Sequence, residues 1–125
     1  MIRGLGVDLV QISRMEDLLK RHGERALERL FTDEERRGGD GRARAGEYYA
    51  ARFAAKEAFL KAIGVGMTGD VSWQEVEVRR EDGGNPWLEL RGTAKRRMEE
   101  RGATRAHVSL SHEAGQAVAV VVLED

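Results

Sequence analysis

Residues 4–9 alternate between apolar positions and glycine or acidic positions, which is the period of a β-strand. Leu5, Val7 and Leu9 fall on one face of this segment, and Asp8 falls on the other. We therefore expect a short, half-buried strand that displays the carboxylate of Asp8 on the face opposite the three apolar side chains.

The second half of the chain predicts further strands. Val76 and Val78 alternate with charged residues, which predicts a strand. Residues 82–86 contain turn-forming Gly, Asn and Pro, and residues 87–90 read as a returning strand, so a hairpin is expected. Residues 106–110 alternate again. The apolar run at residues 118–123 predicts a last strand that is buried on both faces.

Capping residues mark the expected helix starts. Ser13 with Glu16 and Thr32 with Glu35 match the capping box, in which a hydroxyl and a carboxylate bind backbone donors at a helix start. The first pair predicts a helix that ends just before Gly23, and the second predicts a short helix that ends in the glycine-rich run after it.

Residues 47–63 are rich in alanine and are followed by Gly64, which predicts a long helix with a left-handed cap. Residues 93–101, closed by Gly102, predict another helix. A further capping-box match at residues 72–75 is discounted because a strand pattern follows it. The order of elements indicates an α+β fold with helices packed over a small antiparallel sheet.

Length and composition narrow the function classes. The length predicts one domain over residues 1–125, and 21 basic against 22 acidic residues give no overall field for nucleic acid or an anionic membrane. The chain has no cysteine, which excludes disulfides and fits a reducing cytoplasm. The longest apolar run is far shorter than the ~20 residues of a membrane helix, and residues 1–6 lack a secretion signal. We expect a soluble cytoplasmic protein.

Phe53, Glu57 and Lys61 are four residues apart on the long predicted helix, so they share one face. Ala50 and Ala54 flank Glu57 and would let another group approach the helix closely. The alternative is that Glu57 and Lys61 form an ordinary helical ion pair, worth about 0.3–0.5 kcal/mol.

Lys56 and Arg52 lie on an adjoining strip of the helix and are expected to border Glu57 with positive charge, which would suit a phosphate. Asp8 can also be explained as a turn or capping residue. Neither Asp8 nor Glu57 is diagnostic by itself.

Three segments taken together resemble the holo-acyl-carrier-protein synthase family of phosphopantetheinyl transferases: residues 6–14 (GVDLVQISR), 52–62 (RFAAKEAFLKA) and 109–112 (SLSH). The resemblance implies an enzyme of fatty acid biosynthesis that moves 4'-phosphopantetheine from coenzyme A to a serine of apo-acyl carrier protein. It also implies a homotrimer with each coenzyme A site between two protomers.

By this resemblance, Asp8 and Glu57 hold Mg²⁺, a hard cation that prefers carboxylates together with phosphate oxygens. The metal would bind the diphosphate of coenzyme A, and Lys61 would add positive charge beside it. The serine proton would go to a carboxylate or to a metal-bound hydroxide. The sequence does not choose between these two acceptors, although we favour Glu57.

Arg52 and His112 match coenzyme A phosphate contacts of the family. Gly64 and Gly66 match a glycine-bounded turn whose backbone amides approach a phosphate or the adenosine end. Without the resemblance, a surface position explains His112 and a helix C-cap explains Gly64 equally well.

Arg14 matches a family contact with acidic groups of the carrier protein, and its helix carries further basic residues whose alternative role is a solvated face. Arg42 and Arg44 could reach phosphates or the partner. Gln11 stands where many relatives have Glu, and Val65 where Thr is common, so partner contact or nucleotide fit could differ.

Two other function classes fit the same residues. A magnesium-dependent phosphoanhydride hydrolase would use the same carboxylates with water as the nucleophile. A non-catalytic module would only dock acidic proteins through the basic helix that contains Arg14. Only a transferase would add a pantetheine arm to a carrier protein, so this product distinguishes it from the hydrolase and from the non-catalytic module.

Overall fold

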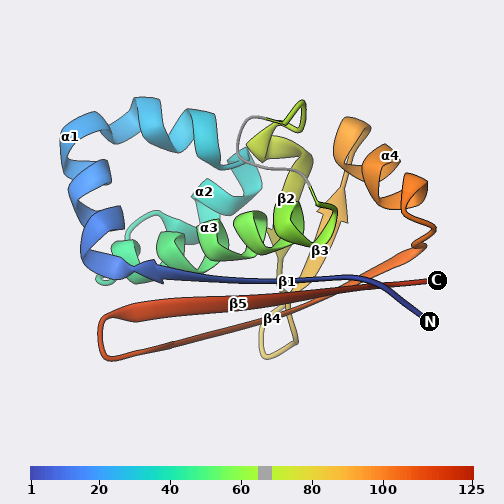
Figure 1. Cartoon of the computed structure of the whole chain (residues 1–125). Helices are drawn as coiled ribbons and strands as arrows, with labels where there is room; N and C mark the ends of the chain where they lie inside the picture. Colours follow the sequence, from blue (N-terminus) through green and yellow to red (C-terminus); the bar gives the residue numbers. More distant parts are fainter. Residues whose placement is uncertain (65–68) are drawn as a thin grey trace.

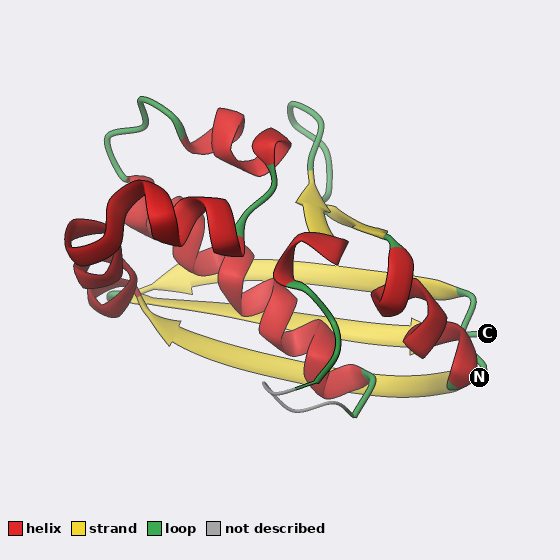
Figure 2. Cartoon of the chain, turned by 90° about the horizontal axis from the view of Figure 1, so that it is seen from above, coloured by secondary structure: helices red, strands yellow, loops and turns green. Residues whose placement is uncertain are grey.

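The computed structural model describes residues 1–64 and 69–125. An antiparallel sheet with strand order β1-β5-β4 carries the labelled helices on one side, and β2 pairs with β3 in a separate hairpin (Figures 1 and 2). In chain order the elements are β1 (Ile2–Gln11), α1 (Ile12–Leu30), α2 (Asp33–Gly39), α3 (Ala45–Ala62), η1 (Trp73–Glu75), β2 (Val76–Arg79), β3 (Trp87–Leu90), α4 (Gly92–Glu100), β4 (Arg105–Glu113) and β5 (Gln116–Glu124). The predicted α+β fold is confirmed.

Two glycines of β1 allow this strand to lie directly against α3. A Cβ atom added to Gly6 would collide with the carbonyl oxygen of Ala58, and one added to Gly4 would collide with that of Ala62. No other residue fits such a close approach of strand and helix backbones. The contact fixes the face of β1 that contains Gly4, Gly6 and Asp8 against the helix.

The alternation predicted for residues 4–9 is confirmed, but the expected orientation of its faces is wrong. Leu5, Val7 and Leu9 are 65%, 53% and 59% exposed, and Gly6 is buried. The physical reason is the helix contact, because only the face with glycines is flat enough to pack on α3. The apolar side chains therefore lie on the outer face of the sheet.

The central strand β5 shows the same division. Ala117, Ala119, Val121 and Leu123 are completely buried beneath the helices, whereas Val120 on the other face is 37% exposed. The prediction that this strand is buried on both faces is therefore wrong for its outer face. The helices cover only one side of the sheet, as Figure 1 shows.

The long helix and its cap are confirmed, since α3 is followed by Gly64 with a φ of +78°. The predicted start of α1 is wrong, because Gln11 is the N-cap residue and Ser13 lies inside the helix. The backbone amide of Ile12 donates to the carbonyl of Gly115 at 2.9 Å, so the turn before β5 supplies an acceptor at the helix start.

Gly23 interrupts α1 with non-helical angles (φ 47°, ψ −123°), as its position predicted, but the helix then continues to Leu30. The capping box of Thr32 and Glu35 is confirmed. The discounted match at residues 72–75 also forms both capping bonds, on the short helix η1, so that exclusion was wrong. A single 3₁₀ turn fits between the cap and the following strand.

Lys56 is completely buried and joins α3 to three other elements. Its Nζ donates to Glu35 Oε1 at 2.8 Å, to the carbonyl of Trp73 at 3.0 Å and to that of Val76 at 2.6 Å. Glu35 Oε2 in turn accepts from the amide of Val78 at 2.8 Å. Burial lowers the pKa of Lys56, and the charge of Glu35 opposes that shift. The pair fastens α2, η1 and β2 to the long helix.

Replacing Lys56 with Met should reduce the free energy of unfolding by about 3–5 kcal/mol, because Glu35 would keep an unpaired charge in the core. Chemical denaturation measures this loss, with Lys95→Met on the exposed face of α4 as the control. Adding Glu35→Gln should recover part of the stability. A change within about 1 kcal/mol of the wild type would show that the buried pair is not needed.

Candidate functional site

β1 and α3 bring three of the predicted site residues together. Lys61 Nζ donates to Asp8 Oδ1 at 3.1 Å and to the carbonyl of Val7 at 3.0 Å. Glu57 is only 9% exposed. Burial raises the pKa of Glu57, the charge of Asp8 raises it further, and Lys61 partly offsets both. Two carboxylates and a cation thus interact where the strand crosses the helix.

The donor set at this point fits magnesium. Asp8 and Glu57 supply two carboxylates, and the described residues contain no group of three or more His, Cys, Asp or Glu that could enclose a metal. Mg²⁺ commonly binds through one or two carboxylates and completes its shell with water and substrate phosphates. With a divalent cation on the two carboxylates, the charge of Lys61 would make the cluster positive and would favour an anionic substrate.

The expected open surface around Glu57 is not present on its own helix face. Ala50 and Ala54 are completely buried in the core, and the ring of Phe53 packs on Trp73 with centroids 5.1 Å apart. The small residues that admit a close neighbour are instead those of α3 beneath the glycines of β1. That neighbour is the protein's own strand.

The two cations expected beside Glu57 lie elsewhere. Lys56 forms a buried ion pair with Glu35, so it does not border the carboxylate of Glu57. Arg52 lines a separate cavity that neither Glu57 nor Lys61 lines. Arg52 and Lys61 are nine positions apart, about two and a half helical turns, so the two side chains leave opposite sides of α3.

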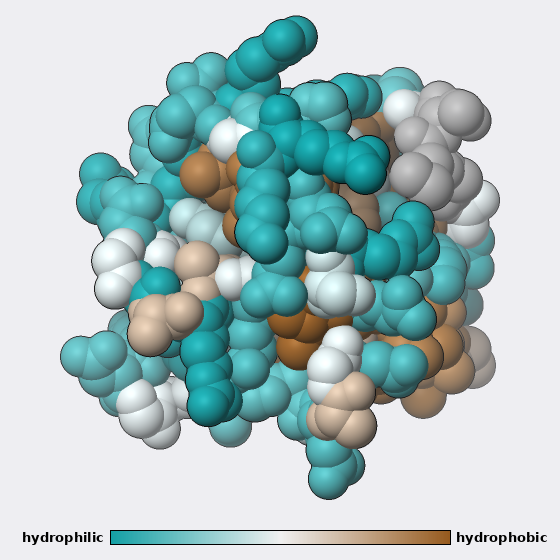
Figure 3. All heavy atoms as spheres, turned by 90° about the vertical axis from the view of Figure 1, so that its left-hand side faces the viewer, coloured by the Kyte–Doolittle hydropathy of each residue, from teal (hydrophilic) through white to brown (hydrophobic). Residues whose placement is uncertain are grey.

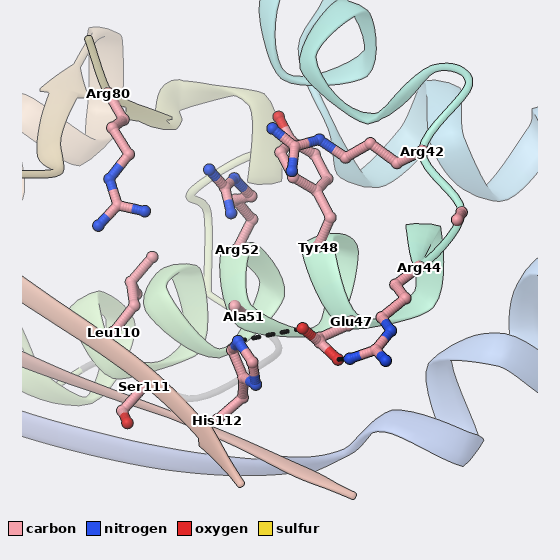
Figure 4. Close-up of a pocket in the computed structure, with 11 residues that line it drawn as sticks. Arg42, Arg44, Glu47, Tyr48, Ala51, Arg52, Arg80, Leu110, Ser111 and His112 are labelled. Carbon is pink, nitrogen blue, oxygen red and sulfur yellow. Dashed lines mark ion pairs between the residues drawn. The ribbon is translucent and has the colours of Figure 1, made fainter. Parts of the chain in front are cut away.

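This separate cavity is rich in arginine. It has a volume of about 590 Å³ and lies between the start of α3, the end of β2 and the end of β4 (Figure 4). Arg52 and His112, which the sequence predicted as phosphate contacts, both line it. The other charged or aromatic lining residues are Arg42, Arg44, Glu47, Tyr48 and Arg80. We call this cavity the arginine pocket.

Side chains of the arginine pocket are held in two ways. His112 Nε2 lies 3.0 Å from Glu47 Oε1, and Arg44 lies 3.9 Å from the other oxygen of Glu47. The guanidinium carbon of Arg52 lies 3.8 Å from the centroid of the Tyr48 ring. Arg52 Nε is buried and has no hydrogen-bond partner among the described residues. Burial lowers the pKa of Arg52, so an anionic ligand would offset an electrostatic cost.

Sequence reasoning missed Glu47, Tyr48 and Arg80 as parts of this pocket. Glu47 and Tyr48 stand in the first turns of an alanine-rich helix and gave no signal beyond helix formation. Arg80 follows directly after β2, and no pattern in the sequence shows that the hairpin approaches α3. Only the packing of these elements brings them together.

The remaining predicted residues lie at the surface. Arg14 is exposed on α1, and the end of the molecule where α1 begins is covered mainly by hydrophilic side chains (Figure 3). Gly64 is exposed, and next to it Arg101 Nη1 donates to the carbonyl of Ile63 at 3.5 Å. Gly66, the other predicted glycine of this turn, lies outside the described residues, as does Val65.

Comparisons with known proteins identify the family of this chain. A family model described as the 4'-phosphopantetheinyl transferase superfamily matches residues 4–121. A holo-[acyl-carrier-protein] synthase from Koribacter versatilis is 47% identical over 125 residues, which is all of both chains.

Solved structures show the same similarity. The holo-[acyl-carrier-protein] synthase from Neisseria meningitidis superimposes with a TM-score of 0.88, with 36% identity over all of both chains. The enzyme of that name from Bacillus anthracis, in complex with CoA (3',5'-ADP), gives a TM-score of 0.81 and 38% identity over 99% of this chain and 97% of that one. The resemblance found from the three sequence segments is confirmed, and the chain belongs to the 4'-phosphopantetheinyl transferase superfamily.

Proposed function

We propose that this protein is a holo-[acyl-carrier-protein] synthase, which transfers 4'-phosphopantetheine from coenzyme A to a serine of apo-acyl carrier protein. The observation that carries this proposal is the meeting of Asp8, Glu57 and Lys61 in a chain whose relatives bear that name over their full length. The product serves fatty acid biosynthesis, and the enzyme acts in the cytoplasm. None of the described helices is long and apolar enough to cross a membrane.

Asp8 and Glu57 would hold Mg²⁺, and Lys61 would place its ammonium group beside the diphosphate of coenzyme A. When bound, the metal offsets the charge of the diphosphate and polarises its β-phosphorus. The serine oxygen attacks this phosphorus, the bond to the bridging oxygen breaks, and adenosine 3',5'-bisphosphate leaves. Glu57 is our candidate for the carboxylate that accepts the serine proton.

Arg52 and His112 would bind the other phosphate group of coenzyme A, on the ribose 3' oxygen. The Nε of Arg52 is buried and has no hydrogen-bond partner in the part of the chain that the structure describes, which supports an anion in the arginine pocket. Arg52 and Lys61 leave opposite sides of α3, so one copy of the chain does not present both groups in one direction. A site in which one copy supplies Asp8, Glu57 and Lys61, and another supplies the arginine pocket, fits this arrangement.

The outer face of the sheet supports association of copies. Leu5, Val7, Leu9 and Val120 are all exposed there, on a face that the helices leave bare. Neighbouring exposed apolar side chains on a flat sheet are typical of a surface that another chain covers. We therefore propose the homotrimer implied by the family resemblance, assembled through this face.

Replacing Asp8 or Glu57 with Ala should lower kcat by about 10³-fold in the presence of magnesium while the fold is retained, because the metal and the diphosphate would lose a carboxylate. Mass spectrometry of apo-carrier protein measures the gain of a pantetheine arm, and release of free 4'-phosphopantetheine instead would indicate a hydrolase. Glu99→Ala on the exposed side of α4 is the control. A substantial residual rate in either variant would contradict the assignment.

Replacing Arg14 with Glu should weaken binding of apo-carrier protein about tenfold at low ionic strength and less at high salt, because an attraction becomes a repulsion. Calorimetric titration at two salt concentrations measures the effect. Arg96→Glu, which reverses an exposed charge on α4, should leave binding unchanged. Equal affinities for the Arg14 variant and the wild type would exclude the α1 docking surface.

Mixing two inactive variants should restore activity if each site is shared between copies. Glu57→Ala removes one half of the site, and Arg52→Gln with His112→Ala removes the other. Random assembly of equal amounts should give about a quarter of the wild-type rate, because that fraction of sites receives both intact halves. Each variant refolded alone is the control. A mixture no more active than the sum of its parts would place both halves in a single copy.

A further inference from the structure

Tyr48 lies between two arginines of the arginine pocket. The guanidinium carbon of Arg52 is 3.8 Å from the centroid of its ring, and that of Arg42 is 4.7 Å from the same centroid. Figure 4 shows both guanidinium groups gathered at this ring. Two like charges repel one another, and the electron-rich face of an aromatic ring offsets part of that repulsion.

The ring of Tyr48 is itself held firmly. Its hydroxyl donates to the backbone carbonyl of Glu35 at 2.6 Å, and its ring packs edge-to-face with that of Tyr49, with centroids 5.0 Å apart and an interplanar angle of 88°. Gly38 leaves room for the hydroxyl, because a Cβ atom at that position would collide with it. Tyr48 is therefore a fixed support and not a mobile surface side chain.

The two arginines on Tyr48 are held without a carboxylate. Within the part of the chain that the structure describes, neither Arg42 nor Arg52 forms an ion pair, whereas Arg44 faces Glu47. Arg42 Nε donates to the carbonyl of Gly38 at 2.5 Å. A carboxylate would neutralise the guanidinium charge and occupy its N–H donors, whereas an aromatic face leaves the in-plane donors available for another ligand.

We propose that Tyr48 is a positioning residue that holds Arg42 and Arg52 ready to bind the 3'-phosphate of coenzyme A. This rests on the proposed function, and it adds a residue that does not itself contact the reacting atoms. Because Tyr48 replaces an anionic partner, it orders both guanidinium groups without neutralising their charge before the phosphate binds. Its effect is therefore specific to substrates that carry this phosphate.

The test compares coenzyme A with 3'-dephospho-coenzyme A as donors. Tyr48→Met removes the aromatic face but keeps much of the volume, and it should lower kcat/KM about tenfold with coenzyme A, whereas the loss with 3'-dephospho-coenzyme A should be below about twofold. The preference for the 3'-phosphate should fall accordingly. Tyr48→Phe keeps the ring and should retain a preference close to that of the wild type.

Phe53→Leu is the matched control, because Phe53 is an aromatic residue of the same helix that packs on Trp73 and, among the described residues, has no arginine stacked on its ring. It should lower stability yet leave the preference unchanged. Arg42→Gln changes an exposed residue and should reduce the preference in a folded protein. The Arg42→Gln variant tests the pocket even if Tyr48→Met does not fold. In that case Tyr48→Leu is used in place of Tyr48→Met.

The possible results distinguish a failure of the role of Tyr48, of the 3'-phosphate site and of the proposed function. If the wild type adds pantetheine to carrier protein but Tyr48→Met lowers kcat/KM equally with both donors, Tyr48 has only a structural role. If Arg42→Gln leaves the preference intact, or the wild type does not distinguish the two donors, the arginines do not bind the 3'-phosphate. If the wild type transfers from neither donor, the proposed function itself fails, and the role of Tyr48 fails with it.

Discussion

The approach of β1 to the long helix is the constraint on which the site depends. Gly4 and Gly6 let the strand backbone reach the carbonyl groups of α3, at a distance that no side chain would permit. Asp8 follows on the same face of the strand and is thereby placed within reach of Glu57 and Lys61. Two glycines thus allow the carboxylates and the ammonium group of the site to come together.

The long helix uses three cationic residues for three different purposes. Lys56 points into the core and is neutralised by Glu35, Lys61 pairs with Asp8 beside the second carboxylate, and Arg52 stacks on Tyr48 at the arginine pocket. Their spacing along the sequence shows on which side of the helix each one lies, but not what that side contacts. Their roles differ because the sides of the helix contact different elements: α2 and β2, the first strand, or the pocket between the hairpin and β4.

Much of the fold could be predicted, because strand alternation, alanine content and capping residues act locally. The helix at Ala45–Ala62 and the hairpin of β2 and β3 both lie where the sequence placed them. Orientation was harder. Periodicity divides residues 4–9 into two faces but does not say which one meets α3, and the apolar face suggested the wrong answer. The burial of Lys56 was missed because its partner lies 21 positions away in sequence. The arginine pocket combines residues from distant segments, and a single sequence does not show that these segments lie close together in the fold.

The outer face of the sheet has a consequence for how stability should be understood in this protein. A folded copy that keeps Leu5, Val7 and Leu9 in water has not yet gained the hydrophobic free energy that their burial would provide. Where copies cover one another's sheets, that gain belongs to the assembly, and mass action then makes the melting temperature rise with protein concentration. Dilution alone would weaken such a fold, without any change in the chain.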